Sequence, residues 1–298
     1  MTLERAESGK PQPPPLYYLL APGEQRTGQA NPVWFAQTGH SHLLDRSEPM
    51  IVKWLSEQHT IATELACSLA AQTLGCPVPG GALVVADRDQ LPGLPDKAVG
   101  ERLLLYGSFF VEPDRYLAEV LRQDGGTEDA LWSRVCGSQA GPRGAALDEL
   151  LANPDRHVGN VLFDGRAWWL IDHERALQPA SEWARDWARR ETRQHAVQFA
   201  ARVNLLASHM LRLLPTKREW LARQPQAFDR QKRQLSALAN WVGTWRDPDT
   251  RIEGLWQLTS LFLDLIATRL PALAHHLNKR APDQSASQLE WTSPAPQR

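Results

Sequence analysis

Three polar residues, Asp155, Asn160 and Asp172, lie in a stretch of mostly apolar and turn-forming residues. Carboxylate and amide oxygens are hard ligands of the kind that suits Mg²⁺, which completes its octahedron with water and phosphate oxygens. Asn160 and Asp172 are therefore candidate metal ligands. Asp155 precedes Asn160 by five positions. It is left as a loop carboxylate that can accept a proton from a substrate hydroxyl.

The chain around these residues predicts how they come together. A helix is expected to end before Asn153-Pro154, which cannot continue it. Residues 161–171 predict two short strands joined by a turn at Asp164-Gly165, a dipeptide typical of tight hairpins. Because a hairpin returns the chain, Asp172 is expected to lie near Asn160. The alternative is that these side chains only cap turns and the next helix.

An aspartate, an asparagine five positions later and a second metal-binding aspartate form the arrangement of protein kinases. The motif sequences differ from those of protein kinases. The loop here is Asp-Arg-His-x-x-Asn, and Asp172-His173-Glu174 stands where protein kinases carry Asp-Phe-Gly. The stretch from Asn153 to Asn160 resembles the HipA-like kinases and, more distantly, the phosphoinositide lipid kinases. The resemblance implies a two-lobed protein-kinase-like fold with ATP between the lobes.

An upstream lysine supports this interpretation. Lys53 lies in an apolar run, Met50 to Leu55, that predicts a strand, and a charge there must find a counter-charge or reach water. Glu64, in the middle of a helix expected over 57–74, is the best partner. Glu57 is the rival, but the helix dipole already explains an acid in a first turn. We expect Lys53 to bind ATP phosphates; an exposed edge lysine is the alternative.

The end of that helix extends the resemblance. HipA-like families carry a strand lysine, a helix with a Glu and a Leu-Gly-x-Pro-x-Pro ending, which Leu74-Gly75-Cys76-Pro77-Val78-Pro79 fits. The resemblance covers about residues 33–180. It implies a Ser or Thr of a protein as the phosphate acceptor and, often, a role as a bacterial toxin module. The roles that follow are proton acceptance by Asp155, Mg²⁺ binding by Asn160 and Asp172, and phosphate binding by Lys53 held by Glu64.

No Gly-x-Gly-x-x-Gly motif precedes the lysine. In its place stands Thr38-Gly39-His40-Ser41-His42, where backbone N–H groups around Gly39 and Ser41 can cover phosphates. A plain turn is the alternative. His40 and His42 have no apparent third ligand for a metal, so surface histidines are expected.

Composition limits the classes that remain. The chain has 298 residues, 42% of them apolar and 22% charged, which excludes wholesale disorder. A net charge of −1 excludes a globally basic nucleic-acid binder. Three cysteines without a Cys-x-x-Cys pair argue against a disulfide framework or zinc ribbon. No apolar run reaches the roughly 20 residues of a membrane helix. We therefore expect a soluble, cytoplasmic protein.

The order of elements predicts an α+β fold of two lobes. Residues 16–112 mix strands with one helix and form the small N-lobe, and residues 113–280 form a larger, mostly helical C-lobe with the catalytic loop. Residues 1–15 and 281–298 are polar and are expected to be disordered tails. Helices of the C-lobe are expected over 116–122, 145–151, 183–214, 216–245 and 252–277.

A local excess of basic residues predicts a candidate binding surface, but it does not identify the binding partner. Residues 181–233 hold 12 basic and five acidic residues, and such a face can bind an acidic protein, a nucleic acid or phospholipid headgroups. A solvated face is the alternative, since Arg185, Arg189 and Arg193 follow helical spacing. The function expected is an ATP- and Mg²⁺-dependent protein kinase. A lipid or small-molecule kinase and a catalytically silent nucleotide-binding scaffold remain open.

Overall fold

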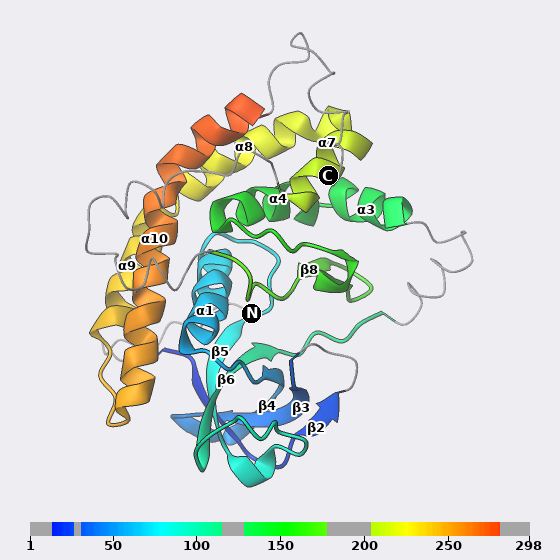
Figure 1. Cartoon of the computed structure of the whole chain (residues 1–298). Helices are drawn as coiled ribbons and strands as arrows, with labels where there is room; N and C mark the ends of the chain where they lie inside the picture. Colours follow the sequence, from blue (N-terminus) through cyan, green and yellow to red (C-terminus); the bar gives the residue numbers. More distant parts are fainter. Residues whose placement is uncertain (1–13, 27–30, 115–127, 178–203, 281–298) are drawn as a thin grey trace.

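The computed structural model describes residues 14–26, 31–114, 128–177 and 204–280. The helix expected over 116–122, the Arg185–Arg193 face and nearly all of the two predicted tails lie outside these ranges. The described chain is a mixed structure of strands and helices (Figure 1), with the sheet built from the first part of the chain and most helices from the second.

The sheet curls into a small barrel. Its strands are β1 (Leu16–Leu19), β2 (Glu24–Arg26), β3 (Val33–His40), β4 (Leu43–Lys53), β5 (Gly81–Asp87) and β6 (Arg102–Phe109). They pair in the order β1-β5-β6-β4-β3-β2, and β1 also pairs with β3, which closes the sheet on itself. A 3₁₀ turn, η1 (Arg88–Gln90), follows β5.

Alternation along the strands separates two apolar cores. On β5, Ala82, Val84 and Ala86 face the barrel interior, whereas Leu83 and Val85 join the core shared with the helices. Successive side chains of a strand point to opposite faces, so a single strand serves both cores.

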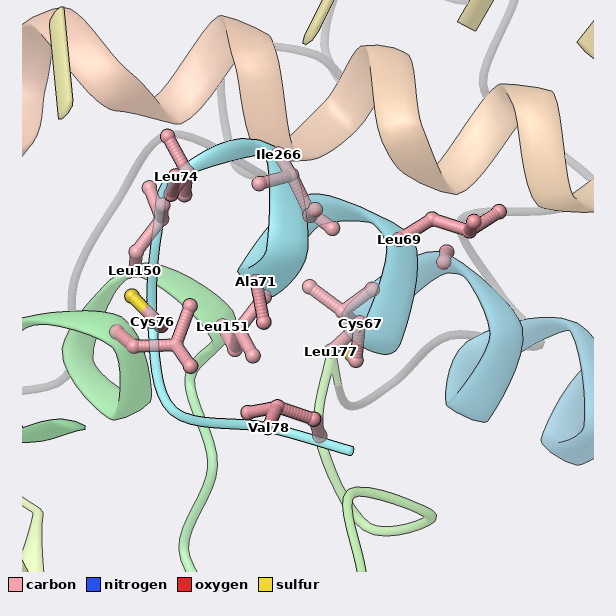
Figure 2. Close-up of a cluster of buried hydrophobic side chains, with 14 of the residues drawn as sticks. Cys67, Leu69, Ala71, Leu74, Cys76, Val78, Leu150, Leu151, Leu177 and Ile266 are labelled. Atoms are coloured by element: carbon pink, nitrogen blue, oxygen red, sulfur yellow. The ribbon is translucent and has the colours of Figure 1, made fainter. Parts of the chain in front are cut away.

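The helix α1 (Gln58–Thr73) lies between the sheet and the remaining helices (Figure 1). Every residue from Ile61 to Ala71 is buried. This burial explains why small and apolar residues occur on every face of the helix and not on a single stripe. Figure 2 shows how its C-terminal half and the chain that follows it, through Cys76 and Val78, pack against Leu150, Leu151 and Ile266. The helix that carries Glu64 is thus fixed from both sides.

The rest of the described chain is mainly helical. The helices are α3 (Glu128–Gly137), α4 (Ala140–Leu151), α7 (Leu205–Leu213), α8 (Arg218–Asp229), α9 (Lys232–Thr244) and α10 (Thr250–Arg280), with 3₁₀ turns η2 (Val158–Asn160) and η3 (Pro215–Lys217). Strands β7 (Val161–Phe163) and β8 (Trp168–Leu170) form an antiparallel hairpin. Buried contacts tie α10 to α4, because His276 pairs with Glu149 and Arg269 donates to the Leu150 carbonyl.

Most expected elements are present, with the following differences. The short strands β1 and β2 and the helix α3 were not expected. The helix expected over 216–245 is two helices, α8 and α9. Helix α4 begins at Ala140, because Pro142 lies in its first turn, where a missing N–H costs nothing. Among the described helices, none combines the length and the hydropathy that a bilayer span requires.

Candidate active site

A fully buried ion pair forms the base of the site. Helix α4 ends with Ala152 in the left-handed region at φ 49°, which turns the chain into the polar loop. Arg156 makes a bidentate pair with Asp148, at 2.9 Å for both Nε–Oδ2 and Nη2–Oδ1. Asn153 donates to Asp148 Oδ1 at 3.0 Å. The loop is therefore anchored to the helix before it.

The same arginine joins the two ends of the predicted hairpin. Arg156 Nη1 donates to the carbonyl of Asn160 at 2.8 Å and to that of Ile171 at 2.6 Å. The Ile171 N–H in turn donates to the Asn160 carbonyl at 3.1 Å. Asp172 therefore directly follows a residue hydrogen-bonded to Asn160, and the structure brings these two predicted metal ligands together.

The loop also orients Asn160 and Asp155. The Asn160 amide Nδ2 donates to the Asp155 carbonyl at 2.8 Å, and no described residue hydrogen-bonds to Asn160 Oδ1. The side chain of Asp155 is one-third exposed and lies 3.3 Å from Arg175 Nη1. Asn160 Oδ1 is therefore without a partner among the described residues, and the carboxylate of Asp155 is partly exposed beside Arg175.

Lys53 stands at the end of β4 and faces three carboxylates. Its Nζ lies 3.7 Å from Glu64 Oε1, 3.0 Å from Asp172 Oδ1 and 2.5 Å from Glu174 Oε2. We call these four residues the Lys53 cluster. Burial alone would lower the pKa of Lys53, but the three carboxylates outweigh it and raise that pKa, so the lysine is charged.

Glu64 is the most buried member of the cluster. Its Oε2 accepts the backbone N–H of His173 at 2.9 Å, whereas its Oε1 has no hydrogen-bond partner. Burial raises the pKa of Glu64 to about 8 although Lys53 opposes the shift, and the Asp172 carboxylate raises it further. Glu64 is thus fixed in place, and its Oε1 faces the ammonium group of Lys53 at 3.7 Å.

His173 links Glu64 to Arg156, because its backbone N–H donates to Glu64 and its side chain bonds to Arg156. Its side chain is buried, and its Nε2 lies 2.9 Å from Nη2 of Arg156, which can only donate. Burial, followed by the charges of Arg156 and Lys53, lowers the pKa of His173 well below its usual value. The imidazole is therefore neutral and accepts at Nε2.

Oxygens of Glu64, Asp172 and Glu174 lie within 4.8 Å of one another. The described residues contain no other such group of His, Cys, Asp or Glu, so His40 and His42 belong to none. The sequence argument missed Glu174. The available signal was an acid at the position where protein kinases carry glycine.

The structure does not bring Gly39 and Ser41 to the lysine. Gly39 is near the tip of the β3–β4 hairpin and pairs with Ser47, whereas Lys53 pairs with Val33 at the other end. Six positions along β3 separate the two pairs, which is about 20 Å of strand. The reason is the length of the hairpin. The chain just before β3 is the part near the cluster, since Asn31 donates to Glu174 at 2.8 Å.

In the described part of segment 181–233, some of the arginines form ion pairs with acidic residues. Arg212 pairs with Asp129, and Arg223 pairs with Glu219 one helical turn away. These contacts fit a solvated face over residues 204–233. The remainder of the segment lies outside the described ranges.

Comparisons with known proteins show a likeness in structure and none in sequence families. No protein-family model matches the chain, and no curated protein matches it. The crystal structure of the Helicobacter pylori proinflammatory kinase CtkA is similar at 12% sequence identity and a TM-score of 0.49. The match covers 88% of this chain and 98% of that chain. The functional proposal rests on the site residues.

Proposed function

We propose that this protein is an ATP- and Mg²⁺-dependent phosphotransferase with a kinase-like fold. In this proposal residues 16–112 form the N-lobe and residues 113–280 the C-lobe. The observation that carries it is the convergence on Lys53 of Glu64, from a helix, and Asp172, from the end of a hairpin. Catalysis in this class is mainly positioning and charge neutralisation, so a fixed lysine beside a metal-binding carboxylate is its main requirement.

The donor set suits Mg²⁺. Asp172 supplies a carboxylate and Asn160 supplies an amide oxygen that no described residue hydrogen-bonds. Even with Glu64 as the neutral acid that its raised pKa favours, the cluster has two carboxylates for one lysine and carries an excess of negative charge. When bound there with ATP, Mg²⁺ would neutralise phosphate charge. Lys53 would hold phosphate oxygens, and Glu64 would keep the lysine extended.

Asp155 is assigned to the acceptor hydroxyl. Its carboxylate is partly exposed, and its backbone is tied to Asn160, so the proton acceptor is held at a fixed distance from the metal ligand. In this role Asp155 orients the hydroxyl and accepts its proton as the phosphoryl group moves. We propose a Ser or Thr hydroxyl of a protein as the acceptor.

The proposal is tested by transfer of labelled phosphate from ATP into cell lysate. The parent protein is compared with Asp155→Ala, Asp172→Ala and the control Asp229→Ala, an exposed acid on α8. We expect Asp155→Ala to lose at least about 100-fold in transfer while still binding ATP. Asp172→Ala loses both transfer and Mg²⁺-dependent binding, and the control keeps both. Transfer by Asp155→Ala at the parent rate contradicts the assignment of the base.

The label also separates the alternatives. Label in protein bands supports a protein kinase. Label only in the lipid or small-molecule fraction supports a lipid or small-molecule kinase, the alternative that the Asp-Arg-His-x-x-Asn loop favours. A silent scaffold would gain thermal stability with nucleotide and transfer nothing.

A further inference from the structure

Two of the three N–H donors of Lys53 are already directed to carboxylates in this structure, those of Asp172 and Glu174. An ammonium group has three N–H donors, and the Lys53 side chain, 12% exposed, is surrounded by three carboxylates. The shortest of the three contacts, at 2.5 Å, is to Glu174 and not to Glu64 or Asp172. The third donor faces Glu64 Oε1 at 3.7 Å, without a hydrogen bond. A phosphate oxygen that takes the place of Glu174 on the lysine must therefore displace that carboxylate.

Glu174 is the partner that the proposed function leaves free to move, because Glu64 positions the lysine and Asp172 is assigned to the metal. Glu64 is buried and bonded to the backbone of His173, and Asp172 follows a hairpin that Arg156 holds closed. The Glu174 side chain is 21% exposed, and apart from Lys53 it accepts one hydrogen bond among the described residues, from Asn31. To leave the lysine, Glu174 therefore gives up one ion pair and one hydrogen bond.

The next residue covers the other proposed catalytic group. Arg175, 62% exposed, lies 3.3 Å from Asp155, so two adjacent residues pair with the lysine and with the base. Non-glycine residues with positive φ lie on both sides of them, Asp172 at 61° and Leu177 at 54°. Such strain is typical of segments that switch between arrangements.

We propose that Glu174 is an internal competitor of the nucleotide, whose carboxylate occupies the place of a phosphate oxygen against Lys53. The inference rests on the proposed function and adds the regulation of its site. ATP must displace Glu174 before the lysine can bind a phosphate, so the apparent Kd for ATP is larger than the open site would give. Asn31, which shares the Glu174 carboxylate, holds it in the closed position.

Two substitutions separate competition from simple repulsion. Glu174→Gln removes the charge, while Glu174→Asp keeps the charge but shortens the side chain so that it no longer reaches Lys53. If Glu174 competes by contact, both variants bind ATP more tightly. If it only repels the triphosphate, Glu174→Gln alone does. Asn31→Ala leaves every charge in place and gives a smaller gain in ATP affinity. It serves as a further variant if either Glu174 substitution impairs folding.

The experiment is calorimetric measurement of the Kd for ATP in EDTA and with Mg²⁺. We expect Kd to fall about tenfold for Glu174→Gln and about threefold for Glu174→Asp in both media, since partly buried ion pairs exceed surface pairs in strength. The exposed control Glu219→Gln leaves Kd unchanged.

Three results overturn the inference while leaving the proposed function in place. One is an unchanged or larger Kd for both Glu174 variants and Asn31→Ala. Another is tightening by Glu174→Gln alone. A third is weaker ATP binding by Glu174→Gln only when Mg²⁺ is present, which makes Glu174 a metal ligand. If neither the parent nor any variant binds ATP, the proposed function fails together with the inference.

Discussion

The Asp148–Arg156 pair and the Lys53 cluster both join a cation to carboxylates, but only the pair leaves no donor unused. Arg156 directs its N–H groups to Asp148, to two backbone carbonyls and to His173, and it is completely buried. An arginine has five N–H donors, and all are satisfied here. This pair holds the loop and the hairpin in one geometry.

The Lys53 cluster is built in the opposite way. Three carboxylates share one lysine, Glu64 Oε1 has no hydrogen-bond partner, and Asp172 is one-third exposed. Its charge is unbalanced and open to solvent. The difference indicates that balanced, buried charge serves as scaffold in this protein, whereas unbalanced, accessible charge marks the place where a ligand binds.

The largest effect is expected from breaking the balanced pair. Asp148→Ala leaves Arg156 buried without its counter-ion, which should lower the free energy of unfolding by about 3–5 kcal/mol. Urea denaturation measures the loss. Glu219→Ala, which breaks an exposed pair with Arg223, should change it by less than about 1 kcal/mol. A loss for Asp148→Ala as small as that of the control would show that the pair is not the scaffold.

A smaller, pH-dependent effect is expected from Lys53→Met. Removing the lysine leaves three carboxylates facing one another and should cost about 1–3 kcal/mol near pH 8. In the parent the pKa of Lys53 is raised, so its ion pairs stabilise the fold below the usual lysine pKa and are lost only as pH rises above it. In the variant the raised pKa of Glu64 favours the protonated acid, so stability returns as pH falls.

The check is the difference in unfolding free energy between parent and Lys53→Met near pH 8 and near pH 5. Lys97→Met, at an exposed lysine next to Trp54, is the matched control. The difference should shrink on acidification for Lys53→Met and stay constant for the control. An equal loss at both pH values would contradict the unbalanced-charge account.

The smallest effect is expected at the turn that joins β7 to β8. Asp164 accepts the N–H groups of Arg166 and Ala167 and the indole N–H of Trp169. These bonds, that of Ala167 first, lower the pKa of Asp164. Their contribution is therefore present above the usual Asp pKa and lost as pH falls through the lowered value.

Asp164→Ala should cost about 1 kcal/mol of unfolding free energy at neutral pH, because exposed hydrogen bonds contribute little net stability. In urea denaturation at several pH values, the gap between parent and variant should close in acid. A gap that widens as pH falls would contradict the direction of the pKa shift.

Local patterns in the sequence were sufficient for much of the fold. The apolar runs Ala82 to Ala86 and Leu103 to Val111 predict strands, which the structure shows as β5 and β6, and a glycine followed by prolines marked the end of α1. The Asp164-Gly165 turn predicted the hairpin that carries Asp172. Strand β1 was missed because four apolar residues form a strand only through partners distant in sequence, on β3 and β5.

The site was predicted only in part for the same reason, because some of its contacts join residues that are distant in sequence. Lys53 and Glu64 stood out because each is a charge in an apolar element, and the structure brings them to 3.7 Å. Glu174 lies in a loop, where its type alone does not indicate a partner, and the structure shows its contact with Lys53. The distance of Gly39 from the lysine depends on strand register, which spacing along the chain does not fix.

The most direct test of the central claim is a crystal structure of the protein with Mg²⁺ and a non-hydrolysable ATP analogue. The account predicts a metal ion bound by Asn160 and Asp172, with Lys53 in contact with a phosphate oxygen and no longer with Glu174. A nucleotide bound elsewhere, with the Lys53–Glu174 contact intact, would contradict it.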